Sequence, residues 1–173
     1  MTIYVSDSYA PDDALTRRWA RFLGGLVHGP ELSGLTLYLA PPSEVARDCP
    51  GEAFGCYAPA SGQIEAIGDP SAGIPPEAVV AHEYGHYIAS YRENTPWDAV
   101  AWGTKRWGSY EDVCARAAHG LAFPGDEGAH YALNPGEAFA ETYRMLNVAS
   151  AVVRWALVAP SFYPDAGGAA QRA

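Results

Sequence analysis

The sequence predicts an α+β domain, because segments with β-type patterns come early in the chain and segments with helical patterns come late. The chain has 173 residues, the length of one ordinary domain, and can bury a sizeable core without a disulfide or metal. Hydrophobic residues make up 49% and charged residues 18%, a composition that excludes intrinsic disorder. We therefore expect one domain over residues 1–173, with a flexible tail after about residue 160.

The first helix is expected to begin at residues 11–13, Pro-Asp-Asp, because acidic residues favour the first turn of a helix. Gly29-Pro30 stops it. Its apolar residues recur at helical spacing: Leu15, Trp19, Phe22, Leu23 and Leu26. A strand is expected next over residues 35–40, and a loop over residues 41–53.

Two short strands are expected over residues 54–58 and 63–67, on either side of a turn that contains Pro59 and Gly62. The next helix is expected to open at Pro75-Pro76, because proline is tolerated in the first turn, and to run to about Tyr91.

The second half of the chain is expected to be mainly helical. Residues 97–119 are predicted to form two helical pieces broken near Gly108, followed by a glycine-rich loop over residues 120–133. Asn134-Pro135 should cap a helix that runs to about Asn147, and a short apolar helix should follow to Ala159.

The charge balance limits the partners. The chain has 11 basic and 20 acidic residues, a net charge of −9, and phosphate binding needs a basic face, so we expect no nucleic-acid partner. No apolar stretch reaches the roughly 18 residues that span a bilayer, so we expect no membrane insertion. We expect a monomer that acts on a peptide or protein substrate.

The cysteines bear on the compartment. Cys49 and Cys56 lie seven positions apart in a segment rich in Pro and Gly, and a disulfide between them would indicate an oxidising compartment. Three reduced thiols, with Cys114, are the equal alternative. The chain as given begins without a signal peptide, so it is either cytoplasmic or the mature part of a secreted protein, and we favour the secreted reading.

The segment Ala81-His82-Glu83-Tyr84-Gly85-His86 carries the most specific signal in the chain. Histidines four positions apart on a helix lie on one face, so both imidazoles can bind one zinc ion. Glu83 is rotated by roughly 100° from His82 and points alongside the metal, which suits a general base. An apolar stripe of Val80, Tyr84, Tyr87, Ile88 and Tyr91 occupies the opposite side of the predicted helix.

Two histidines need a third protein ligand if one zinc position is to stay open for water. The candidates are Glu137 and Glu141, which share one face of the predicted helix after Asn134-Pro135. The opposite face of that helix is expected to anchor it to the core through Phe139, Tyr143 and Leu146. The alternative is a solvated face on which Arg144 pairs with Glu141.

The motif His-Glu-x-x-His followed, 51 residues after His86, by Glu-x-Phe-Ala-Glu-x-Tyr-Arg resembles the gluzincin peptidases. Among these it is similar to the catalytic domain of anthrax lethal factor and to the bacterial Pro-Pro endopeptidases, over roughly residues 79–146. The resemblance implies a small zincin-like domain, in which a short mixed β-sheet precedes the active-site helix and a helical C-terminal half carries the glutamate ligand. It implies zinc ligation by His82, His86 and Glu137, with Glu83 as the base. Glu141 would orient a ligating histidine.

The resemblance further implies a tyrosine before the third ligand whose hydroxyl stabilises the oxyanion. Tyr131 lies six positions before Glu137 and His130 lies seven before it, which is the family's usual spacing. Both stay candidates, and we favour Tyr131. An edge strand upstream of the active-site helix would pair with an extended substrate, and residues 63–67 are the candidate.

The expected function is that of a zinc-dependent endopeptidase, in which Glu83 activates a zinc-bound water that hydrolyses the peptide bond. The alternatives are a non-catalytic binding module on a peptidase scaffold and a latent peptidase whose cleft is covered by the N-terminal arm or by the tail after Pro160. The preserved Glu83 argues against the first alternative, because a purely structural metal site does not use a base.

Overall fold

The computed structural model describes residues 1–51, 53–71 and 73–148. Over these residues the chain forms seven α-helices and a four-stranded mixed sheet, which confirms the mixed α+β class. Its internal contacts divide the chain within one helix into two units, Met1–Tyr84 and Gly85–Ala173. The expectation of a single domain over residues 1–173 stays a prediction. No helix in the described part of the chain is long and apolar enough to cross a bilayer.

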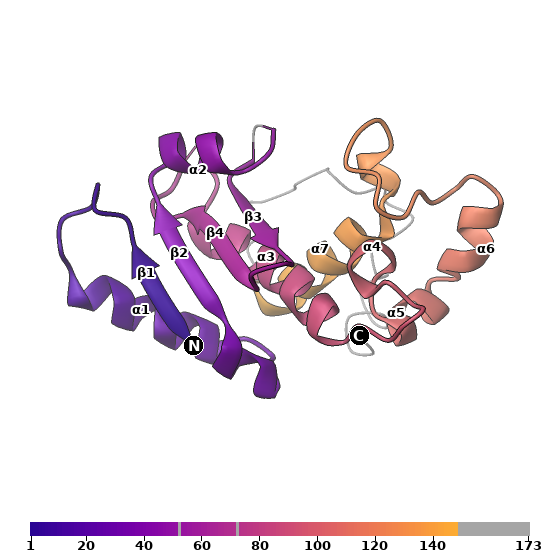
Figure 1. Ribbon diagram of the computed structural model, residues 1–173, viewed down its shortest axis with the longest axis horizontal. Coiled ribbons are helices and arrows are strands. Elements are labelled where there is room, and N and C mark those ends of the chain that lie inside the picture. The colour runs from indigo at the N-terminus through magenta and orange to yellow at the C-terminus, as the bar shows by residue number, and fades with distance from the viewer. Residues whose placement is uncertain (52, 72, 149–173) are drawn as a thin grey trace. The chain divides into compact units, whose positions relative to one another are not determined.

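The first unit contains the sheet (Figure 1). Its strands follow one another in space as β1 (Thr2–Val5), β2 (Thr36–Ala40), β4 (Gln63–Ile67) and β3 (Gly55–Ala58). The first three are parallel, and β3 runs antiparallel to β4. The three strands expected from the sequence are confirmed, whereas β1 was not anticipated. Because β3 pairs only with β4 among the described strands, it forms one edge of the sheet.

One face of the sheet is apolar. Leu37 and Leu39 of β2 and Ile64 and Ala66 of β4 are fully buried there, in the alternate positions that a strand directs to one side. Helix α1 (Asp13–Gly25) adds the buried Trp19 and Leu23 to the core, and Asp12 caps it by accepting a hydrogen bond from the Ala14 N–H. A short 3₁₀ helix, η1 (Pro30–Gly34), leads into β2.

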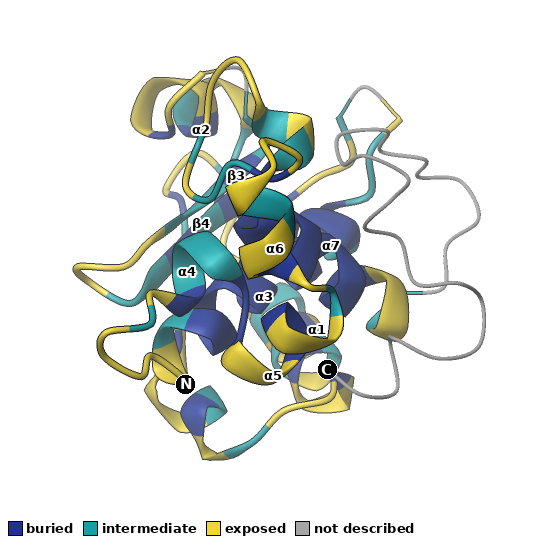
Figure 2. Cartoon of the chain, turned by 90° about the vertical axis from the view of Figure 1, so that its right-hand side faces the viewer, coloured by how far each residue is buried: buried dark blue, intermediate teal, exposed yellow. Residues whose placement is uncertain are grey.

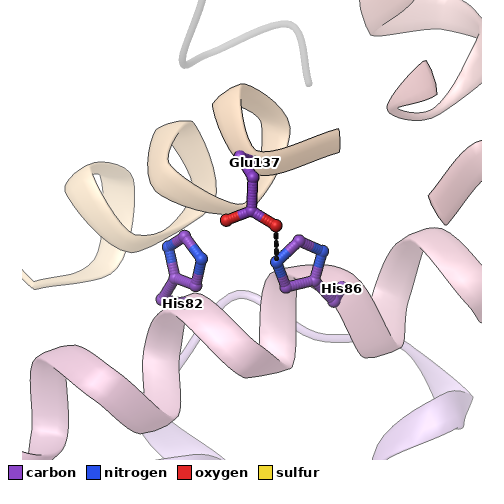
Figure 3. Close-up of side chains that lie close together, drawn as sticks. All are labelled: His82, His86 and Glu137. Carbon is purple, nitrogen blue, oxygen red and sulfur yellow. Dashed lines mark ion pairs between the residues drawn. The ribbon is translucent and has the colours of Figure 1, made fainter. Parts of the chain in front are cut away.

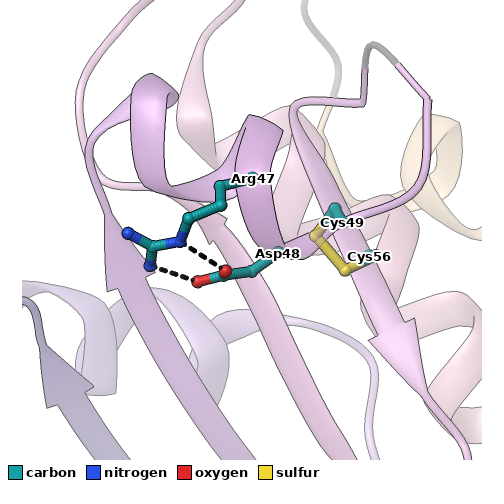
Figure 4. The surroundings of a disulfide bond; sticks show 4 residues. All are labelled: Arg47, Asp48, Cys49 and Cys56. Carbon is teal, nitrogen blue, oxygen red and sulfur yellow. Dashed lines mark hydrogen bonds and ion pairs between the residues drawn. A yellow bond between two sulfur atoms is a disulfide. The ribbon is translucent and has the colours of Figure 1, made fainter.

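Helix α2 (Pro42–Asp48) packs against β2 and β4, so the loop expected over residues 41–53 is wrong. Pro42 takes a first-turn position, where its missing N–H costs nothing, and Arg47 lies in the last turn, where a cation is favourable. A disulfide joins Cys49, at the end of α2, to Cys56 of β3, as Figure 4 shows. Of the two alternatives for the cysteines, the disulfide is therefore the one observed.

Helix α3 (Pro76–Tyr91) has the bounds that the sequence predicts. The expected two pieces over residues 97–119 are wrong, because three helices form there: α4 (Ala99–Trp102), α5 (Lys105–Tyr110) and α6 (Val113–Ala118). The breaks fall at Gly103 and Asp112, which both have positive φ, while Gly108 lies inside α5.

Helix α7 (Pro135–Asn147) begins after Asn134 as expected, and a 3₁₀ turn, η2 (Tyr131–Leu133), precedes it. The apolar helix expected up to Ala159 and the tail after residue 160 lie outside the described residues. Helices α3 and α7 are buried over most of their length (Figure 2).

Candidate metal site

The helix that carries the His-Glu-x-x-His motif is buried on all sides. Every residue from 78 to 89 is buried, including His82, Glu83 and His86, whose exposed fractions are 4%, 8% and 9%. A helix buried all round is typical of the centre of a protein. The expected apolar stripe holds as far as Ile88 and is wrong at Tyr91, which is 56% exposed.

His82 and His86 project from successive turns of α3, and Glu137 of α7 lies opposite them (Figure 3). One ligand atom from each of the three side chains lies within 4.8 Å of those of the other two. His86 Nε2 lies 3.1 Å from Glu137 Oε1. Three buried side chains of the kinds that bind metals thus converge on one point.

The donor set fits a zinc ion. Zn–N and Zn–O bonds of about 2.0–2.2 Å in a tetrahedron place neighbouring ligand atoms about 3.3–3.5 Å apart. The 3.1 Å between His86 Nε2 and Glu137 Oε1 is close to this value, so a small side-chain movement brings both atoms to ligand distance. The group can therefore hold a metal ion, and three protein ligands leave a fourth position open.

The start of α7 holds Glu137 in place. Asn134 caps the helix by accepting a hydrogen bond from the Gly136 N–H at 3.0 Å. It also accepts one from the Gly125 N–H at 3.2 Å, which ties the preceding loop to the start of α7. Pro135 occupies the first helical position, and Glu137 follows within the first turn. The partial positive charge of a helix N-terminus favours an ionised carboxylate at this point.

Tyr131 and His130, the two candidates for the oxyanion donor, have different surroundings. The Tyr131 hydroxyl donates a 2.5 Å hydrogen bond to Glu137 Oε2. The exposed His130 stacks on Phe123, with ring centroids 3.8 Å apart, and its Nδ1 lies 2.8 Å from Asp126 Oδ2. Of the two, the structure therefore brings Tyr131 to the metal-ligand group.

Glu141 lies one turn after Glu137 and forms a buried ion pair. Arg144 Nε and Nη2 donate to its two carboxylate oxygens at 2.8 and 2.6 Å, and both residues are 3% exposed. The alternative of a solvated face is therefore wrong, although the pairing it named is present. Phe139 and Tyr143 are buried as expected, whereas Leu146 is 38% exposed.

Helix α3 is held in position by two contacts that the sequence analysis did not anticipate. The buried Glu31, in η1, accepts a hydrogen bond from the Tyr84 hydroxyl at 3.2 Å. A Cβ on Gly55 of β3 would stand 2.6 Å from Val79 Cγ1, so this strand approaches the helix closely. Nothing in the sequence could reveal the first contact, because its partners are 53 residues apart.

The expectation that an edge strand over residues 63–67 pairs with substrate is wrong. Residues 63–67 form β4, which is bonded to β2 on one side and to β3 on the other, so they do not lie at an edge. The strand that follows α2, β3, holds the edge position next to β4 instead.

No protein-family model matches the chain, and neither the curated proteins nor the solved structures yield a match.

Proposed function

We propose that the protein is a zinc-dependent endopeptidase of the gluzincin type. The observation that carries the proposal is the buried group of His82, His86 and Glu137, with Glu83 next to the first ligand on the same helix. Two imidazoles and one carboxylate are the protein ligands of well-known catalytic zinc sites, which keep one position for water. A structural zinc site is usually closed by four protein ligands and needs no adjacent acid.

The chain's own residues supply the remaining chemistry. Bound zinc would contribute Lewis acidity, which polarises a carbonyl and lowers the pKa of water. Glu83, as a carboxylate, accepts the proton of the attacking water and delivers it to the leaving amine. The Tyr131 hydroxyl, which already reaches Glu137, donates a hydrogen bond to the oxyanion. Glu141, held by Arg144, is proposed to orient a ligating histidine.

Strand β3 is the proposed platform for the substrate backbone. An exposed edge strand can hydrogen-bond an extended peptide as one further strand. Within the first unit, β3 is the edge that contacts α3, through Gly55 and Val79, three residues before His82. A peptide added there would run beside the helix that carries the base.

The second candidate function is a latent or non-catalytic peptidase-like module. The observation in its favour is the burial of all four site residues: His82, Glu83, His86 and Glu137 are each less than 10% exposed. A substrate reaches side chains buried to this degree only if the residues that cover them move.

Metal analysis combined with peptide cleavage tests the proposal. Wild type should bind about one zinc per chain and cleave members of a peptide library. Chelation should abolish cleavage and added zinc should restore it. Glu83→Gln should keep the metal and lose activity, whereas Glu137→Gln should lose or weaken the metal. Glu77→Gln, in the first turn of the same helix, is the matched control and should change neither property.

Each result separates the candidates. Zinc binding without cleavage by wild type would overturn the endopeptidase and support the latent or binding module. A wild type that takes up no zinc would exclude the proposed chemistry altogether. Cleavage that survives Glu83→Gln would show that another residue is the base.

A further inference from the structure

The edge strand β3 carries one aromatic residue, Tyr57, on the face of the sheet that meets α3. Gly55 lies on that face, since a Cβ at Gly55 would point at Val79 Cγ1. Side chains two positions apart in a strand lie on the same face, so Tyr57 shares it. Tyr57 pairs with the fully buried Ile64 of β4, which in turn pairs with the fully buried Leu37 of β2. Tyr57 is therefore the outer end of an apolar row.

Tyr57 lies about level with the turn of α3 that holds His82 and Glu83. Strand β3 and helix α3 run in the same direction in Figure 1. Two strand residues, from Gly55 to Tyr57, advance about 7 Å, and three or four helix residues beyond Val79 advance about 4.5–6 Å. Since Gly55 and Val79 are in contact, the two segments reach a similar level.

The backbone pattern of β3 directs a bound peptide to the same place. The hydrogen bond from the Ile67 N–H to the Phe54 carbonyl identifies one of the hydrogen-bonded pairs of this antiparallel ladder. These pairs alternate with non-hydrogen-bonded ones, so the N–H and C=O groups of Gly55 point away from β4 and toward the edge. A peptide that pairs there would place its side chains alternately on the face that carries Tyr57.

We infer that Tyr57 determines substrate specificity, by selecting a large apolar or aromatic side chain close to the scissile bond. This inference rests on the endopeptidase proposed above. A half-buried tyrosine that continues a row of Leu and Ile offers an apolar ring surface, and its hydroxyl is a polar tip. The row contains no charged residue, so a charged substrate side chain would be desolvated without a partner at this position.

A position-scanning peptide library tests the inference. Wild type should prefer Leu, Met, Phe or Tyr over Asp, Lys and Gly at one position near the scissile bond. Tyr57→Ala should lower kcat/KM for those peptides about tenfold or more and flatten the profile at that position alone, because the substrate side chain loses its apolar contact with the ring. Tyr4→Ala is the matched control, because Tyr4 is also a tyrosine in an edge strand, β1, and is 56% exposed. It should leave the profile unchanged.

Binding measurements separate selection from folding. In the Glu83→Gln background, Tyr57→Ala should weaken binding of the preferred peptide and leave binding of a peptide with Gly at that position unaffected. The zinc content and the melting temperature should not change. Cleavage by wild type together with an unchanged profile in Tyr57→Ala would overturn this inference alone. A decrease in kcat/KM that is equal for all peptides would also overturn this inference. A wild type that cleaves no peptide would overturn the proposed function, and this inference with it.

Discussion

Gly85 of α3 lies directly against Ala140 of α7: a Cβ built on Gly85 would stand 2.7 Å from the Ala140 Cα and 3.1 Å from its carbonyl oxygen. No side chain separates the two helix backbones at this point. The contact lies next to His86 and three residues after Glu137, so the close approach of the two backbones lets the side chains of His86 and Glu137 meet. The glycine within the His-Glu-x-x-His motif therefore brings these two candidate ligands together through packing.

Gly85→Ala is expected to destabilise the fold and weaken metal binding. The added methyl group meets backbone atoms, which cannot rotate away, and overpacking of this kind costs about 1–3 kcal/mol. Chemical denaturation and a zinc competition titration measure the two effects. Gly24→Ala is the control: it lies in α1 with no atom within 4 Å of its Cβ position, and should stabilise by about 0.5–1 kcal/mol. Equal behaviour of the two variants would contradict the packing argument.

Tyr131→Phe is expected to lower kcat by about 10²–10³-fold, because it removes the hydroxyl proposed to donate to the oxyanion. KM should change little, and the zinc content should stay near one per chain. His130→Gln should leave kcat within a few-fold of wild type, since its ring is held by Asp126 and Phe123. The reverse result in steady-state kinetics would assign the donor role to His130.

The residues that meet in the candidate metal site could be predicted from the sequence, because helical spacing fixes which side chains share a face. The helical period of 3.6 residues is enough to place His82 and His86 on one face of a helix. Asn134-Pro135 is a typical helix start and predicts the helix that carries Glu137. Strand order cannot be obtained in this way. A short strand at an edge and one in the middle carry similar patterns, so residues 63–67 were mistaken for the edge.

The buried state of the Glu141–Arg144 pair was beyond prediction for a related reason. A pair of opposite charges on one helix face looks the same in the sequence whether water or protein covers it. Whether the pair is buried depends on which segments, distant in the sequence, pack against that helix face. The loop expected over residues 41–53 is wrong for a different reason: Pro41-Pro42 ends a strand, but proline is also favourable in the first turn of a helix, and here α2 begins at Pro42.

Arg144→Met is expected to destabilise the protein by about 3–5 kcal/mol, because it leaves the Glu141 carboxylate buried without its bidentate partner. The double variant Glu141→Gln, Arg144→Met should recover much of that loss, since no unpaired charge remains. Urea unfolding of the apoprotein isolates this effect from zinc binding. Arg47→Met removes an exposed pair with Asp48 and should leave the unfolding midpoint unchanged. A double variant as unstable as Arg144→Met would exclude the buried charge as the cause.

Asp126, in the loop before Tyr131, should make the stability of the protein depend on pH. The hydrogen bond with His130, followed by that from the Gly128 N–H, lowers the pKa of Asp126 below its usual value. The folded state therefore releases this proton more readily than the unfolded state, so Asp126 stabilises the fold above a pH of about 4 and loses that effect as the pH falls through its lowered pKa.

Asp126→Asn should consequently be less stable than wild type at neutral pH, and the difference in free energy of unfolding should shrink as the pH is lowered from about 5 to about 2. Urea unfolding at a series of pH values measures the difference directly. Asp7→Asn, at an exposed position in the first unit, controls for the general effect of removing a negative charge from a chain with a net charge of −9. A difference between wild type and Asp126→Asn that stays constant over this pH range would show that the Asp126–His130 contact contributes nothing through ionisation. A difference that shrinks equally for Asp7→Asn would assign the effect to net charge.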